Sequence, residues 1–186
     1  MTAWLARPAL TGGAAVTWYT VWRAILPGAS LVLAVLIAAA PGGQGAFPAA
    51  ALVPVMVIFY WVVTGARGLP VALVFLAGLV LDAVSFGPLG AWALIYVAVA
   101  LLAAAVADFA NAGLAHRTAM LAGCLGLASG LQLVLLVLFD AALPSPGQVG
   151  QAIALAVAVY PVLAAVLRVA TVQASGPHAF DREGRP

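Results

Sequence analysis

The sequence predicts an all-α integral membrane protein, in which six transmembrane helices form a bundle and both termini lie in the cytoplasm. Of the 186 residues, 66% are hydrophobic and 6% are charged, and the mean hydropathy is +1.20. A soluble domain carries about 25% charged residues, so this composition cannot supply a surface that faces water. Six long apolar runs and a one-sided distribution of the arginines complete the case.

Each of the six runs comes close to the length that a membrane span requires. A helix needs about 20 apolar residues, with about 17 to 25 tolerated, to cross the ~30 Å hydrocarbon core. The runs cover residues 24–40, 47–63, 69–84, 89–107, 118–139 and 149–167. The connections between them are short and rich in Gly and Pro, as expected of turns. We therefore expect a membrane domain over 24–171, a cytoplasmic segment with interfacial aromatic residues over 1–23, and a disordered cytoplasmic tail over 172–186.

The first three runs each carry one feature of interest. The first follows Arg23 and ends in three alanines that resemble a signal-peptide cleavage site. It is longer than the usual 7 to 15 residues of such a peptide, so we expect a retained helix. The second run contains Pro54, which should kink it. The third run carries Asp82 near its outer end.

The last three runs are closed or interrupted by recognisable residues. Asp108 closes the fourth run and Arg168 closes the sixth. The fifth contains Cys124, the one cysteine of the chain. A single cysteine excludes an intrachain disulfide, and we expect it to be a small buried packing residue. Pro161 should kink the sixth helix.

The arginines set the orientation. All seven basic residues are arginines, and with six spans they fall before the first helix, in the second and fourth connections, and after the last helix. Those regions all lie on one side of the membrane. Cytoplasmic loops are enriched in Lys and Arg, so both termini are expected in the cytoplasm. A different number of helices would scatter the arginines over both faces.

Asp82 is the most informative polar residue. A carboxylate at mid-membrane costs about 2.5 to 3.5 kcal/mol and less near the interface. One turn before it lies Gly78, which allows another backbone to approach closely. Asp82 is therefore either a polar anchor that faces a partner helix or a cavity, or a cap for the backbone amides of the turn at 85–90. The second reading is slightly favoured, because that turn has unpaired amides close by.

The fifth run carries small residues at a spacing of four. Ala122, Gly126 and Gly130 would share one face of a helix and suit close helix contact. We expect this face to pack within the bundle rather than in a dimer.

Several kinds of site are not indicated. Neither histidine has a second ligand at metal-binding spacing, and no catalytic motif or pair of intramembrane carboxylates occurs. The net charge of +2 is too small and dispersed for a nucleic-acid surface. We therefore expect no enzyme, no metal and no cofactor.

One stretch of the chain carries a recognisable set of residues. It begins at Tyr60-Trp61 and Arg67-Gly68 and continues through the spacing G-L-x-x-D-x-x-x-x-G-P-L-G-x-x-A-L over 78–94. With this set, residues 54–100 resemble the rod shape-determining protein MreD family. The length, the six-helix layout and the inward termini also fit. The resemblance implies a fold like that of the substrate-binding subunits of energy-coupling-factor transporters.

The resemblance also implies a function. Members of this family act without catalysis in the elongation machinery of rod-shaped bacteria, in the inner membrane. They associate with the bitopic protein MreC, and through it with MreB, RodA and a class B transpeptidase. The residues expected at the partner contact are Gly78, Asp82, Gly87, Pro88 and Gly90.

Two other functions are weighed against this one. A substrate-binding membrane subunit of a vitamin-type transporter would need a pocket with converging polar groups. The candidate polar groups are Asp82, Tyr96, Ser129, Gln132 and Tyr160. An intramembrane hydrolase would need a nucleophile and a base on neighbouring helices, and no such pair is visible.

Overall fold

The computed structural model describes residues 13–40, 49–65, 69–85, 88–110 and 113–173, and these form helices and connections without a strand. The helices are α1 (Gly13–Ala38), η1 (Ala49–Ala51), α2 (Leu52–Val63), α3 (Val71–Ser85), α4 (Ala91–Ala105), α5 (Ala107–Ala110), α6 (Leu114–Leu138) and α7 (Pro146–Gln173). The prediction of an all-α chain is confirmed for this part of the molecule. The tail was expected over 172–186, but its first two residues belong to α7; residues 174–186 and the first twelve residues lie outside the described part.

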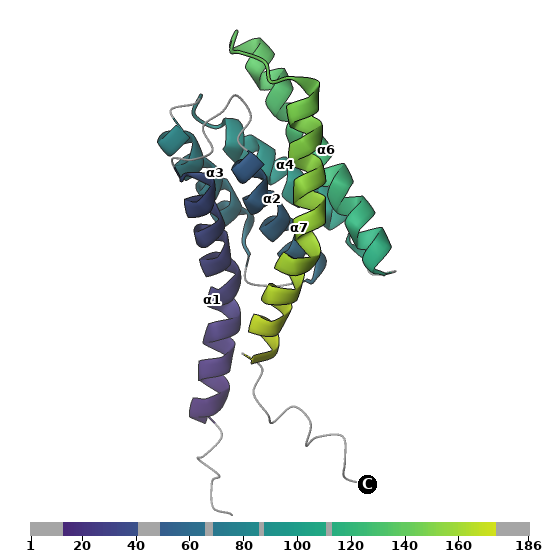
Figure 1. The fold of residues 1–186 in the computed structure, drawn as a ribbon. Helices are drawn as coiled ribbons and strands as arrows, with labels where there is room; N and C mark the ends of the chain where they lie inside the picture. The colour runs from purple at the N-terminus through teal and green to yellow at the C-terminus, as the bar shows by residue number, and fades with distance from the viewer. Residues whose placement is uncertain (1–12, 41–48, 66–68, 86–87, 111–112, 174–186) are drawn as a thin grey trace, which may run out of the picture.

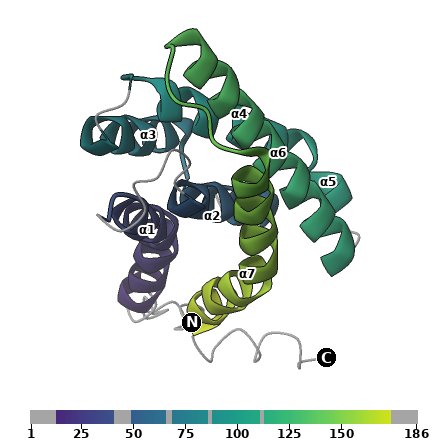
Figure 2. The same ribbon diagram turned by 45° about the horizontal axis from the view of Figure 1, so that its top comes forward.

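Helix α2 is the centre of the bundle. Its sequence, LVPVMVIFYWVV, has no charged residue on any face, and ten of its 12 residues are buried. A helix that is apolar all round is stable only when it is surrounded. The surrounding helices are α1, α4, α6 and α7, which all contact α2, and Figure 2 shows α2 between them.

The first and last helices of the described chain end on the same side of the bundle. The start of α1 and the end of α7 lie at the same end of the bundle (Figure 1). The most extensive contact between two helices of the described chain is that of α3 with α4, which form an antiparallel pair joined by a short connection. Helix α7 bends along its length (Figures 1 and 2), and it contains Pro161, as a proline kink requires.

In the part of the chain that the structure describes, two helices are long and apolar enough to cross a membrane, over Leu114–Leu138 and Pro146–Thr171. Four apolar stretches are shorter, namely Ile25–Ala38, Leu52–Val63, Val71–Ser85 and Ala91–Ala105. A helix of 15 residues, such as α3 or α4, covers about 22 Å at 1.5 Å per residue, less than the ~30 Å hydrocarbon core.

The helix boundaries depart from the apolar runs in a regular way. Helix α1 begins at Gly13, before Arg23, and α6 begins at Leu114, before Arg117. Helix α7 continues past Arg168 to Gln173. Arginine ends a hydrophobic run but has a high helix propensity, so the helices continue where the apolar stretches stop.

Pro54 lies in the first turn of a helix and not in the interior of one, where we expected it. The 3₁₀ turn η1 occupies Ala49–Ala51, and α2 begins at Leu52. Pro54 is therefore in the first turn of α2, where the backbone N–H groups have no intrahelical partner and a proline costs little. The expected kink within a helix of residues 47–63 is replaced by a helix start.

Polar and aromatic contacts link the helices. The indole N–H of Trp61 in α2 donates to Ser30 Oγ in α1 at 2.8 Å, and that hydroxyl donates to the Pro27 carbonyl at 2.9 Å. The rings of Phe59 and Tyr160 meet edge to face, with centroids 5.9 Å apart, and connect α2 to α7. Cys124 is fully buried in α6, as predicted for a packing residue.

Candidate functional site

The contact between α3 and α4 is built on Asp82. Its carboxylate is 1% exposed. Asp82 Oδ2 accepts from the Gly90 amide at 2.8 Å and from the Ala93 amide at 3.5 Å, and Oδ1 accepts from the Trp92 amide at 2.9 Å. These amides belong to the N-cap and first turn of α4, which have no partners within that helix. Asp82 therefore caps α4 from the neighbouring helix.

Gly90 explains why the cap comes from α3. It occupies the N-cap position of α4 with a φ of 96°, a left-handed conformation that favours glycine. Glycine has no side chain that can accept from the first turn, so the carboxylate of Asp82 takes that role. A negative charge is also stabilised at a helix N-terminus by the helix dipole. The capping interpretation of Asp82 is the one that the structure shows.

Gly78 lies one turn before Asp82 and brings the two helices together. It is buried, and a Cβ atom at this position would lie 2.7 Å from the carbonyl carbon of Trp92 and closer still to the backbone of Ala93. No side chain fits in that space. The close approach that the sequence predicted at Gly78 is thus a contact with α4 of the same chain.

The other residues expected at a partner contact lie at the turn between α3 and α4. Pro88 is exposed, Gly90 is half-buried, and Gly87 lies outside the described residues. Between them, Leu89 is 78% exposed, the largest value of any exposed large hydrophobic residue in the described part of the chain. The motif therefore has a buried part, which joins α3 to α4, and an exposed part at the turn.

The small-residue face of α6 does not pack within the bundle as expected. Gly126 and Gly130 are exposed, Ala122 is half-buried, and no atom of the described residues lies within 4 Å of a Cβ built on either glycine. The buried face of α6 instead carries Cys124, Ser129 and Gln132 together with apolar residues. Because a helix in lipid can be apolar on both sides, the glycine spacing did not identify the inner face.

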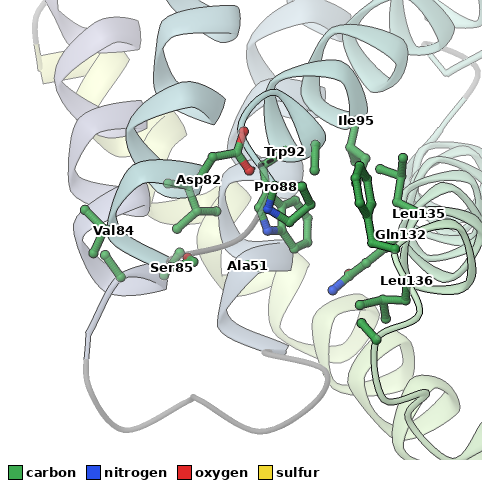
Figure 3. Close-up of a pocket in the computed structure, with 16 residues that line it drawn as sticks. Ala51, Asp82, Val84, Ser85, Pro88, Trp92, Ile95, Gln132, Leu135 and Leu136 are labelled. Atoms are coloured by element: carbon green, nitrogen blue, oxygen red, sulfur yellow. Dashed lines mark hydrogen bonds between the residues drawn. The ribbon is translucent and has the colours of Figure 1, made fainter.

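A cavity of about 360 Å³ lies beside Asp82. Its walls come from the last turns of α1, α3 and α6, the first turns of α4 and the end of η1 at Ala51, with residues of the adjoining connections. Most of the lining is apolar, as at Leu81, Ile95 and Leu135. Figure 3 shows Gln132 extending from α6 into the space that these residues surround.

Two of the five polar groups considered for a pocket meet at this cavity. Asp82 and Gln132 line it. Tyr96 instead donates its hydroxyl to the Ala51 carbonyl at 3.1 Å. Ser129 and Tyr160 are buried but do not line the cavity, and their hydroxyls have no hydrogen-bond partner among the described residues.

Sequence reasoning missed the apolar walls of the cavity, including Trp92 and Phe139. A signal for them existed, since the lining residues lie at helix ends that the expected topology puts on one side of the membrane. Over the described part of the chain, no group of three His, Cys, Asp or Glu side chains could hold a metal ion.

Comparisons of the chain with protein-family models, with curated proteins and with solved structures give no match. The site is therefore interpreted from its own residues and from the resemblance of the 78–94 motif.

Proposed function

We propose that this chain is a six-span protein of the bacterial inner membrane with both termini in the cytoplasm, and that it is a non-catalytic scaffold of the rod-shape complex. In this proposal it binds MreC and, through MreC, joins MreB, RodA and a class B transpeptidase. The proposed scaffold function rests on the 78–94 motif. The proposed membrane topology rests on separate observations.

The apolar surface supports membrane insertion. Large hydrophobic side chains are exposed on all five of α1, α3, α4, α6 and α7, as at Leu36, Leu76, Leu101, Val134 and Val162. A soluble monomer rarely exposes more than a few hundred Å² of contiguous apolar surface. In a bilayer these side chains would face lipid. The helices of 12 to 15 residues would be accommodated by local thinning of the bilayer or by flanking residues.

The position of the cavity supports the alternation of the spans. Its lining joins the C-terminal ends of α1, α3 and α6 to the N-terminal end of α4 and to Ala51, which directly precedes α2. Helices whose opposite ends meet at one place run in opposite directions. Six spans in this order would place that end outside the cytoplasm and the arginines inside.

The exposed turn of the 78–94 motif supports the proposed binding of MreC. Gly78 and Asp82 are used within the chain, against the backbone of α4. What remains open to another protein is the turn, where Pro88 and Leu89 are exposed. We therefore place the contact with MreC at this turn and expect Leu89 to be its main apolar residue.

The test is co-purification of the tagged protein from native membranes in mild detergent, with mass spectrometry of the proteins recovered. We expect MreC with the wild type and about tenfold less of it with Leu89→Ser, since burying a leucine contributes about 1.5 to 3 kcal/mol. Leu143→Ser is the matched control, because Leu143 is also an exposed leucine, at 58%, in the connection after α6. Equal loss with both variants would contradict a contact at Leu89.

The second candidate is the substrate-binding subunit of a vitamin-type transporter, and the cavity with Gln132 favours it. The same experiment separates the two functions. Recovery of an ATPase module or of a bound vitamin in place of MreC would make the transporter the better proposal.

A further inference from the structure

We propose that the cavity beside Asp82 binds a small, uncharged and mostly apolar molecule through a hydrogen-bond acceptor of that molecule, and that the NH₂ group of Gln132 is the donor. This inference goes beyond the scaffold function and does not depend on MreC. It comes from the size and opening of the cavity, from the polar side chains in its lining and from the helix ends that meet there.

The cavity is large enough and open enough to admit a small molecule. Its volume of about 360 Å³ lies within the range of about 300 to 1,000 Å³ that is typical of ligand pockets. Val84, Ser85 and Phe139 line it and are exposed, so it opens at the ends of α3 and α6. Most of the other lining side chains are apolar, as at Leu81 and Ile95, so an apolar body is favoured there.

Gln132 presents a donor to this cavity. Its side chain is 9% exposed and lines the cavity, and Figure 3 shows its amide nitrogen extending into the space that the lining surrounds. The oxygen of the same amide does not face that space, because Oε1 is buried, and it has no hydrogen bond with the described residues. A carboxamide NH₂ group has two N–H donors. What Gln132 offers to a bound molecule is therefore a donor, and the molecule must supply the acceptor.

The other polar side chains of the described lining can donate or are already engaged. Trp92 lines the cavity, and its indole N–H can donate but cannot accept. Ser85 contributes a hydroxyl, which can also donate. Asp82 is 1% exposed, and both of its oxygens accept from backbone amides at the start of α4, so it presents almost no surface to a ligand. The lining therefore favours an acceptor in the ligand over a donor.

The helix ends at the cavity disfavour a negative charge on the bound molecule. The C-terminal ends of α1, α3 and α6 meet there, and a helix C-terminus carries a partial negative charge. The buried Asp82 carboxylate adds to this charge, and no Lys or Arg belongs to the described lining. A carbonyl or ether oxygen accepts a hydrogen bond without a net charge. A ketone, ester or ether therefore suits this site better than a carboxylate or a phosphate does.

The test uses indanone and indane as matched probes, since the two have nearly the same shape and indanone alone carries a carbonyl acceptor. The full-length protein in detergent is heated with each probe, and the reaction of a thiol-reactive dye with the buried Cys124 reports unfolding. We expect indanone to raise the unfolding midpoint of the wild type at lower free concentrations than indane does. The two dissociation constants, each corrected for partition of the probe into detergent, should favour indanone about three- to tenfold, the range of one neutral hydrogen bond.

Variants assign the effect to the cavity and to Gln132. Gln132→Met removes the amide at a similar side-chain volume and should abolish the preference for indanone over indane, whereas Gln151→Met, on the exposed face of α7, should keep it. Ala39→Phe, which fills the cavity from the residue after α1, should abolish the response to both probes while Gln132 is intact.

Three results would overturn the proposal. No shift of the midpoint, or equal affinities of the wild type for indanone and indane, would mean that the cavity recognises no acceptor. Equal responses in the wild type and Ala39→Phe would mean that the probes act outside the cavity. A preference that Ser85→Ala removes and Gln132→Met retains would assign the donor to Ser85. None of these results would bear on the binding of MreC.

Discussion

At the scale of single residues, two glycines at similar helical positions have opposite environments. A Cβ on Gly78 would enter the backbone of α4, at Trp92 and Ala93, whereas a Cβ on Gly126 would meet nothing within 4 Å. The first glycine is required by a contact between two backbones, which cannot yield as a flexible side chain can. The second is required by no contact within the described residues.

This contrast gives a prediction for alanine substitutions. Gly78→Ala should lower the free energy of unfolding by about 1 to 3 kcal/mol or more, because added atoms in a packed interface force the backbones apart. Gly126→Ala should leave stability unchanged or raise it by about 0.4 to 1 kcal/mol, since it restricts the unfolded chain at a helical position. Both changes in stability can be measured by thermal unfolding in detergent, with the reaction of a dye with Cys124 as the readout. Similar losses in the two variants would show that α6 also packs through its glycines.

At the scale of elements, the pair of α3 and α4 depends on a cap supplied across the turn. Asp82 accepts from three amides at the start of α4, and hydrogen bonds to a charged group contribute about 1.5 to 3 kcal/mol. The same hydrogen bonds offset the free-energy cost of burying Asp82, which is 1% exposed. The pair is thus held together by the group that looked most like a binding residue in the sequence.

Asp82→Asn should therefore loosen this pair. An asparagine keeps one acceptor oxygen and turns an NH₂ group toward the amides that the other oxygen served. We expect a loss of about 2 to 3 kcal/mol in the free energy of unfolding. The matched control is Asp140→Asn, because Asp140 is exposed after α6 with a φ of 52°, which asparagine tolerates as well as aspartate does. A loss in the control as large as that at Asp82 would refute the cap as the cause.

The sequence predicted some parts of this site and not others, for physical reasons. The turn at 85–90 signalled unpaired amides, and a glycine one turn before a carboxylate signalled a close approach, so Asp82 and Gly78 could be found. The inner face of α6 could not. In water the contrast between an apolar face and a polar face marks the buried side of a helix, but a helix that is apolar on both sides carries no such mark. Gln132 was noticed as polar, yet its place beside Asp82 follows only from the packing of α6 on α4.

At the scale of the whole molecule, consecutive long helices alternate in direction, and the proposed topology depends on this alternation. The start of α1 and the end of α7 lie together (Figure 1), and the turn at Leu89 and the connection at Leu143 follow α3 and α6, whose C-terminal ends meet at the cavity. With the six spans that we propose, the positive-inside rule would assign Leu89 and Leu143 to the outside, and the connections after α2 and before α6 to the cytoplasm.

Cysteine labelling tests this topology directly. In a Cys124→Ala background, a membrane-impermeant maleimide added to spheroplasts should label Leu89→Cys and Leu143→Cys. It should label Thr64→Cys and Leu114→Cys only after the membrane is permeabilised. All four positions are exposed in the structure, with Leu114 at 64%, so protection would come from the bilayer and not from packing. The reverse pattern would mean that the arginines face outward. A mixture within either pair would mean that the number of spans is not six, because inserting or removing one span between two positions moves them to opposite sides.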